Sequence, residues 1–153
     1  MLIRDKPLKE IILRRYEKPS LDLNERELVK KFCLSLGLLQ PGDRRDVIVD
    51  ILYVLMFSKE PLSISEIKEK AKSFRELNGL TANGLADSNI RRQLRRLKEI
   101  YLVEKIGNAY YISENLSFEE ILNTKIKNFL VDHIFQRIQE YAKAMDALKN
   151  KNV

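Results

Sequence analysis

Hydrophobic residues recur at intervals of three and four over most of the 153-residue chain, a spacing that predicts a mainly helical protein. A first short helix is expected over Leu8–Tyr16, which follows a proline. A second helix is expected to begin at Asn24, because Asn24 and Glu27 have the spacing of a capping box, and to end at Gly37. The pattern therefore predicts an N-terminal helical extension over residues 1–42.

The next segment, residues 43–113, carries the densest pattern. A helix over Arg44–Ser58 has a broad apolar face, as expected for a helix at the centre of a core. Ser63 and Glu66 form a second capping box, and apolar residues follow it at helical spacing as far as Leu77. Residues 78–86 contain two Asn-Gly pairs, which predict a loop.

After this loop the pattern changes from helical to extended and back. A helix rich in arginine is expected over Ser88–Lys98. Two runs of β-branched and aromatic residues then surround a Gly-Asn pair at 107–108, which predicts a two-stranded hairpin. Ser117 and Glu120 form the third capping box, and a helix over residues 118–149 follows without glycine or proline, on the order of 48 Å long at ~1.5 Å per residue. The expected fold is thus mainly α with a small β-hairpin and a long C-terminal helix.

Charge gives the middle of the chain a distinct character. The formal net charge is +6, and residues 51–113 hold 11 basic and 7 acidic side chains, against 11 and 9 before them and 6 and 6 after them. Within that segment the excess gathers in the helix over Ser88–Lys98. Clustered charge of one sign attracts a polyanion, whereas evenly mixed charge does not.

The arginine-rich helix divides into two faces when each residue is given about 100° of rotation. Its apolar residues, Ile90, Leu94 and Leu97, fall within one narrow sector, with Arg92 almost opposite. The candidate nucleic-acid contacts on this helix are Ser88, Asn89, Arg91, Arg92, Gln93, Arg95, Arg96 and Lys98. Arg92, Arg95 and Arg96 are best placed for base edges, and Arg91 and Lys98 for phosphates. A solvated basic face is the alternative, although acidic partners at i,i+4 spacing are too few to explain the run.

The order of elements from residue 44 to 113 resembles the winged-helix subclass of the helix-turn-helix superfamily. The segments that carry the resemblance are Val47–Phe57, Ser63–Ile67, Ile90–Lys98 and Tyr101–Ile112. The resemblance implies that Ser88–Lys98 is a recognition helix for the major groove and that the hairpin is a wing, from which Lys105 and Asn108 reach phosphate or the minor groove. The loop over residues 78–86 is longer than the tight turn typical of the motif.

The C-terminal segment, residues 114–153, consists mainly of the long helix, whose apolar stripe exceeds what one helix could bury against so small a domain. The candidate dimer-interface residues, spaced by three or four, are Leu130, Ile134, Ile138, Tyr141, Met145 and Leu148. Packing of this stripe on the N-terminal helices of the same chain is the alternative. A homodimer would present two recognition helices to a two-fold DNA site.

These features together predict a regulator of transcription that binds specific sequences of double-stranded DNA. A winged-helix module for protein interaction, within a transcription or replication assembly, and RNA binding are the alternatives. Enzyme activity and cofactor binding are not expected, because one histidine and one cysteine provide neither a metal-ligand set nor a Cys/His pair. The single Cys33 and the lack of a long apolar run favour the cytoplasm and give no sign of a membrane segment.

Overall fold

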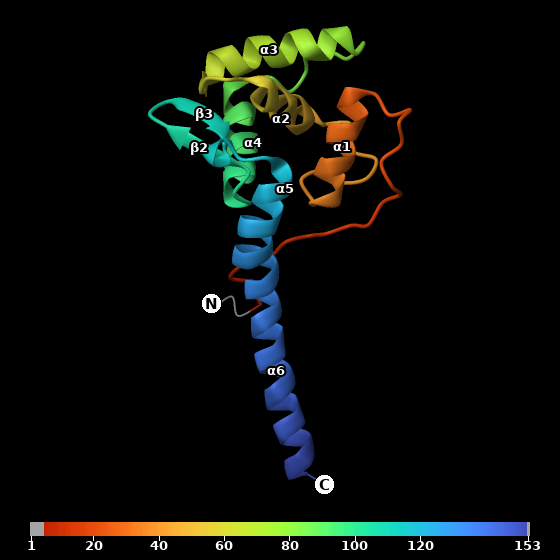
Figure 1. The fold of residues 1–153 in the computed structure, drawn as a ribbon, viewed down its shortest axis with the longest axis vertical. Helices are drawn as coiled ribbons and strands as arrows, with labels where there is room; N and C mark the ends of the chain where they lie inside the picture. The colour runs from red at the N-terminus through yellow and green to blue at the C-terminus, as the bar shows by residue number, and fades with distance from the viewer. Residues whose placement is uncertain (1–4, 153) are drawn as a thin grey trace.

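The computed structural model describes residues 5–152, and residues 1–4 and 153 lie outside it. Over this range the chain is mainly helical, with a small antiparallel sheet and a long C-terminal helix that projects from the rest of the molecule like a stem (Figure 1). The elements are α1 (Glu25–Ser35), α2 (Val47–Phe57), β1 (Leu62–Ser63), α3 (Ile64–Leu77), α4 (Asp87–Glu99), β2 (Val103–Ile106), β3 (Ala109–Ile112), a 3-10 turn (Ser113–Asn115), α5 (Phe118–Ile121), a π-helical segment (Leu122–Val131) and α6 (Asp132–Lys151). No described helix is long and apolar enough to span a bilayer.

Helix α2 lies at the centre of the hydrophobic core and contacts α1, α3, α4 and β3. Its apolar face is broad because neighbours surround it on several sides, and eight of its eleven residues are buried. The core is continuous from Val29 in α1 to Leu130 in the π segment. The predicted helix at this position was longer at its N-terminal end, since residues 44–46 are not helical.

Two of the predicted capping boxes are confirmed in full. The Ser63 hydroxyl accepts a hydrogen bond from the Glu66 amide at 3.2 Å while the Glu66 carboxylate accepts one from the Ser63 amide at 3.1 Å, and Ser117 with Glu120 does the same at the start of α5. Such a box satisfies two amide groups that the first helical turn leaves without partners. The sequence therefore located the starts of α3 and α5 correctly.

The predicted helix over Leu8–Tyr16 is wrong, because this segment is an extended strap. Leu8, Ile12 and Leu13 are exposed whereas Ile11 and Tyr16 pack partly against the core, so the apolar residues do not share one helical face. Nine residues also form too short a helix to persist alone. The strap is held instead by Arg14, whose guanidinium donates to the carbonyl oxygens of Leu34 at 2.8 Å and Leu39 at 3.1 Å. It passes so close to Gly37 that an added Cβ there would lie 2.7 Å from the Ile12 Cβ.

The small sheet has the strand order β1-β3-β2, with both pairs antiparallel. The predicted hairpin is confirmed: Gly107, at a φ of +56°, and Asn108 connect β2 to β3. Pairing of Leu62 in β1 with Tyr110 in β3 attaches the hairpin to the start of α3. The hairpin is thereby fixed next to the N-terminal ends of α3 and α4 (Figure 1).

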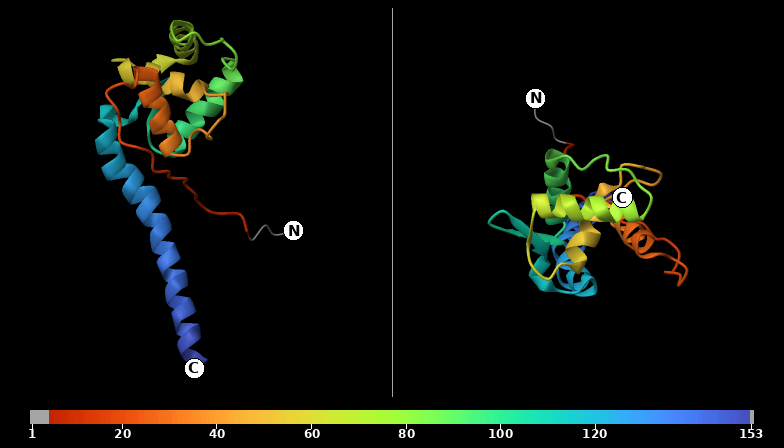
Figure 2. Two further views of the ribbon diagram at one scale, coloured as in Figure 1. Left: turned by 90° about the vertical axis from the view of Figure 1, so that its right-hand side faces the viewer. Right: turned by 90° about the horizontal axis from the view of Figure 1, so that it is seen from above.

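The C-terminal helix is continuous but changes pitch along its length. Ile121, Ile126 and Leu130 are buried against the core, and the first pair is separated by five residues, as the π segment requires. From Asp132 onward no described residue is buried, and Figure 2 shows α6 running away from the other elements. The stripe therefore belongs to the core of its own chain at one end and lies open at the other.

A buried network of four charged side chains ties α1, α2 and α3 together. Asp50, in the middle of α2, is fully buried and accepts hydrogen bonds from Arg26 at 2.9 and 3.0 Å and from Arg75 at 2.6 Å. Asp46 forms ion pairs with the same two arginines, both at 3.1 Å. Two carboxylates and two guanidinium groups make the network electrically neutral, which is the condition under which burial of charge is tolerated.

Candidate nucleic-acid interface

Helix α4 is held on the core by the three apolar residues that the sequence assigned to its inner face. Ile90, Leu94 and Leu97 are each 0% exposed and pack in the core with α2 and α3. Because these three anchors fix the rotation of the helix about its axis, the opposite face is directed away from the core. The predicted division of this helix into an apolar and a basic face is confirmed.

The outer face of α4 is a positively charged surface. Ser88, Arg91, Arg92, Arg95 and Lys98 are all exposed. Among the described residues, no carboxylate lies within ion-pair distance of these arginines or of Lys98, whereas Asp87 pairs with Lys68 of α3 at 3.2 Å. The charge of this face is therefore uncompensated within the described chain, which favours contact with an anionic partner.

One flank of α4 faces the hairpin and encloses a hollow of about 390 Å³. This hollow is lined by Arg91 of α4, by Lys105 and Asn108 of the hairpin and by Ser65 from the first turn of α3. The Lys105 ammonium also lies 5.7 Å from the centre of the Tyr110 ring, whose body is buried. The structure thus brings together the predicted wing residues and one predicted phosphate contact of the helix.

The other flank of α4 carries a chain of hydrogen bonds between polar side chains. The Asn89 side-chain oxygen, Oδ1, accepts hydrogen bonds from Arg92 at 2.8 Å and from Gln93 at 3.1 Å. The Gln93 side-chain oxygen, Oε1, accepts one from Arg96 at 2.8 Å. Arg96 also donates to the Leu38 carbonyl oxygen at 2.7 Å and is partly buried. The structure therefore places Arg96 beside the α1–α2 connection and not on the outer face with Arg92 and Arg95, because its guanidinium satisfies a loop carbonyl.

The candidate dimer residues divide into two groups. Leu130 is 5% exposed and packs in its own core, so it is not available to a second chain. Ile134 is half-buried, and the last four residues, Ile138, Tyr141, Met145 and Leu148, are 56–69% exposed on α6. The open part of the stripe therefore lies within α6 alone.

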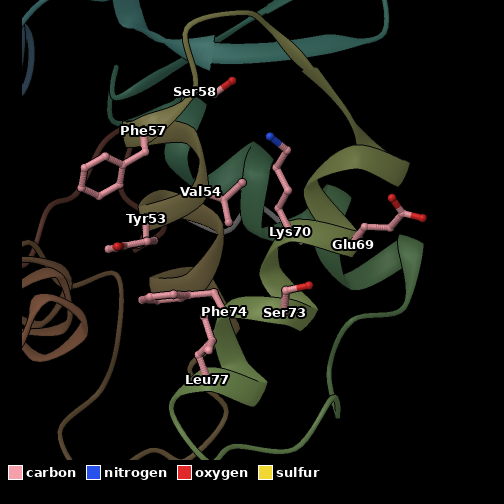
Figure 3. A pocket seen from close by; sticks show the side chains of 9 residues that line it. All are labelled: Tyr53, Val54, Phe57, Ser58, Glu69, Lys70, Ser73, Phe74 and Leu77. Carbon is pink, nitrogen blue, oxygen red and sulfur yellow. The ribbon is translucent and has the colours of Figure 1, made fainter.

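A second hollow, of about 500 Å³, lies between α2 and α3 and contains none of the predicted site residues. Tyr53 and Phe74 stack with their ring centres 3.7 Å apart, and Phe57 and Leu77 lie beside them, both largely exposed (Figure 3). Sequence reasoning missed this surface, because Phe57 and Leu77 fit the helical pattern of core residues.

Groups able to perform chemistry are sparse in the described residues. Burial raises the pKa of the Cys33 thiol to about 12, and the positive charges of Arg96 and Arg26 oppose this only in part. His133 lies on the surface, 3.5 Å from the Lys9 ammonium. No group of three His, Cys, Asp or Glu residues between 5 and 152 is arranged to hold a metal ion.

Comparison with family models, with curated proteins and with solved structures gives no match to this chain. The interpretation of its function therefore depends on the residues and geometry of the surfaces described above.

Proposed function

We propose that this chain is a winged-helix protein that binds specific sequences of double-stranded DNA and regulates transcription. Helix α4 enters the major groove, α3 supports it from behind, and the β2–β3 hairpin is the wing that contacts the adjacent backbone. The observation that carries the proposal is the uncompensated basic face of α4, which is continuous with Lys105 and Asn108 across one hollow.

The residues of this surface are expected to divide into two classes. Arg92 and Arg95 lie opposite the apolar anchors and are assigned to base edges, where the guanidinium fork can pair with guanine. The residues assigned to phosphates are Arg91 and Lys105, which line the hollow beside the hairpin, and Lys98, in the last turn of α4. Base contacts provide specificity, whereas phosphate contacts provide most of the salt-dependent affinity.

The proposal is tested by selecting bound fragments from a genomic DNA pool and measuring affinity for the selected site by fluorescence anisotropy. Arg92→Ala and Arg95→Ala should each cost ~1–3 kcal/mol on that site, and Lys98→Ala should lower the salt slope by about 1. Lys149→Ala is the matched control, since Lys149 is an exposed cation in the last turn of α6, far from this surface (Figure 1). Absence of binding to any duplex at low salt would refute the proposal, and equal affinity for RNA duplexes would favour RNA as the ligand.

The proposed protein acts as a homodimer that pairs through α6. Support comes from the alternating spacing of four and three residues that separates Ile134, Ile138, Tyr141, Met145 and Leu148, the repeat of a coiled coil. Light scattering should give twice the chain mass for the wild type and the single mass for the double variant Ile138→Glu/Met145→Glu. Lys143→Glu, on the opposite side of α6, is the control, and a wild-type monomer at high concentration would contradict the pairing.

A protein-interaction module is the second candidate, and the hollow between α2 and α3 favours it (Figure 3). Phe57 and Leu77 add exposed apolar area at its border, a composition found at the centre of protein interfaces. This candidate becomes the better one if no nucleic acid binds while Phe57→Ser alone removes the protein's function in its host.

A further inference from the structure

The hollow on the second flank of α4 is the largest of those described and has no assigned role. Its volume is about 620 Å³, within the range of about 300–1,000 Å³ that is usual for small-molecule sites. Its lining includes Arg44 and Arg45 before α2, Gly84 before α4, and Arg92 and Arg96 on α4. The α1–α2 connection, the α3–α4 loop and α4 itself thus form its walls.

The charge of this cavity is strongly positive. Five arginines line it against two aspartates, and both aspartates are already paired: Asp43 with Arg45 at 3.2 Å, and Asp46 within the buried network. Among the described residues, Arg44, Arg92 and Arg96 have no carboxylate within ion-pair distance. We propose that this cavity binds a small molecule that carries phosphate groups.

The lining specifies the chemistry of the ligand. A guanidinium presents a planar fork of donors that matches two oxygens of one phosphate, and three guanidinium groups without a carboxylate partner suit more than one such group. No aromatic side chain lines the cavity, and Val47 is its one large aliphatic residue, so the lining offers charge and hydrogen-bond donors and little apolar surface. The expected ligand is therefore compact and highly charged, such as a polyphosphate or a sugar phosphate.

The cavity is largely preformed, because Arg75 and Asp46 belong to the buried network and hydrogen bonds hold the α3–α4 loop. Arg75 and Asp46 are each 5% exposed, and the Arg75 guanidinium donates to the Thr81 carbonyl oxygen at 2.6 Å. The Asn89 side-chain amide donates a hydrogen bond from Nδ2 to the Gly84 carbonyl oxygen at 2.7 Å, which fixes the α3–α4 loop against α4. A site that is organised before the ligand arrives spends less of its binding energy on ordering.

Occupancy of this cavity would act on DNA binding through Arg92, a consequence that rests on the function proposed above. Arg92 lines the cavity and is also assigned to base edges, and hydrogen bonds through Asn89 and Gln93 connect it to Arg96. A phosphate bound between Arg92 and Arg96 would compete with DNA for the same guanidinium. The ligand is therefore expected to be a negative effector.

Binding of the ligand is tested without DNA, with pyrophosphate as the probe and the full chain in isothermal titration calorimetry. The wild type should bind one pyrophosphate per chain saturably, and Arg44→Gln and Arg96→Gln should each weaken binding about tenfold, the loss of one charge-assisted hydrogen bond. Arg15→Gln is the control, because Arg15 is an exposed arginine outside the cavity. Circular dichroism melting verifies that each variant is folded.

Non-saturable binding, or an equal effect of Arg44→Gln and Arg15→Gln, would overturn the proposal. DNA measurements distinguish the other source of phosphate, the DNA backbone. If the cavity holds a small molecule, Arg44→Gln leaves DNA affinity unchanged in the absence of pyrophosphate. The same variant then weakens the inhibition of DNA binding by pyrophosphate, measured against sodium sulfate at equal ionic strength. If Arg44→Gln instead lowers both DNA affinity and its salt slope, the backbone occupies the cavity and the proposal falls. Pyrophosphate binding without any DNA binding would leave this site standing and remove the proposed function.

Discussion

Removal of one charge from the buried network provides the sharpest test of how the fold is stabilised. Asp50→Asn keeps the size of the side chain but removes the negative charge that faces both Arg26 and Arg75. The network then holds two guanidinium groups against the single carboxylate of Asp46. One positive charge is left buried without compensation.

The expected cost follows from the position of Asp50. Breaking a buried ion pair by removing one partner costs about 3–5 kcal/mol, because the remaining charge has lost its solvation as well as its partner. Asp50 is fully buried and accepts three hydrogen bonds, so about 3 kcal/mol is the lower end of the expectation. This is a large share of the roughly 5–15 kcal/mol by which a typical domain is stable.

The measurement is urea unfolding followed by circular dichroism. With a slope of about 2 kcal/mol per molar urea, the Asp50→Asn midpoint should fall by about 1.5 M. Asp146→Asn, an exposed carboxylate on α6, is the control and should not move the midpoint. Asp46→Asn should give a smaller loss, because Asp46 faces the cavity beside α4. A shift below about 0.3 M for Asp50→Asn would show that the network contributes specificity and not stability.

Three further predictions follow from single residues. Burial disfavours the charged form of Asp46, but hydrogen bonds and charge from Arg75 and Arg26 outweigh this effect and lower the pKa of its carboxyl group. The stability that the carboxylate contributes is therefore present above the unfolded pKa of about 3.9 and is lost as pH falls through the lower folded value. Asp46→Asn should thus flatten the fall of the urea midpoint in acid. Cys33, with a pKa of about 12, should resist Ellman's reagent at pH 8 in the native protein and react fully in urea, and rapid native labelling would contradict its burial. Gly84→Ala should destabilise the protein by about 1–3 kcal/mol, measured by thermal melting, because φ is +89° and the new Cβ would lie 2.9 Å from Val47. In the control Gly107→Ala, the new Cβ meets no atom within 4 Å, so the stability should fall only by the strain of its positive φ.

Local signals in the sequence located much of this fold. Ser63 with Glu66 and Ser117 with Glu120 marked helix starts because a capping box depends on residues only three apart. The hairpin at Gly107 depends in the same way on two adjacent residues. The inner face of α4 was correct because burial follows helical periodicity when no neighbouring element interrupts it.

Features that depend on distant residues were not visible in the sequence. Arg26 and Arg75 lie 24 and 25 positions from Asp50, on opposite sides of it in the sequence, so nothing local pairs them. An acidic residue inside the otherwise apolar Val47–Phe57 was nevertheless a signal that a buried partner must exist. The strap over Leu8–Tyr16 had helical spacing, but it contacts the core in an extended conformation through Ile11 and Tyr16. Arg96 left the outer face because of a loop carbonyl 58 positions away.

The π segment sets the phase between the two ends of the C-terminal helix. A regular α-helical pitch over Leu122–Val131 would give α6 a different rotation about its axis relative to the α4-bearing core. In the proposed dimer, this change would alter the rotation of one α4 relative to the other. Successive half-sites on DNA face the same way only at intervals of about 10 base pairs. The helical pitch of these ten residues, none of them assigned to DNA, would then determine which spacing between two half-sites the dimer can bind.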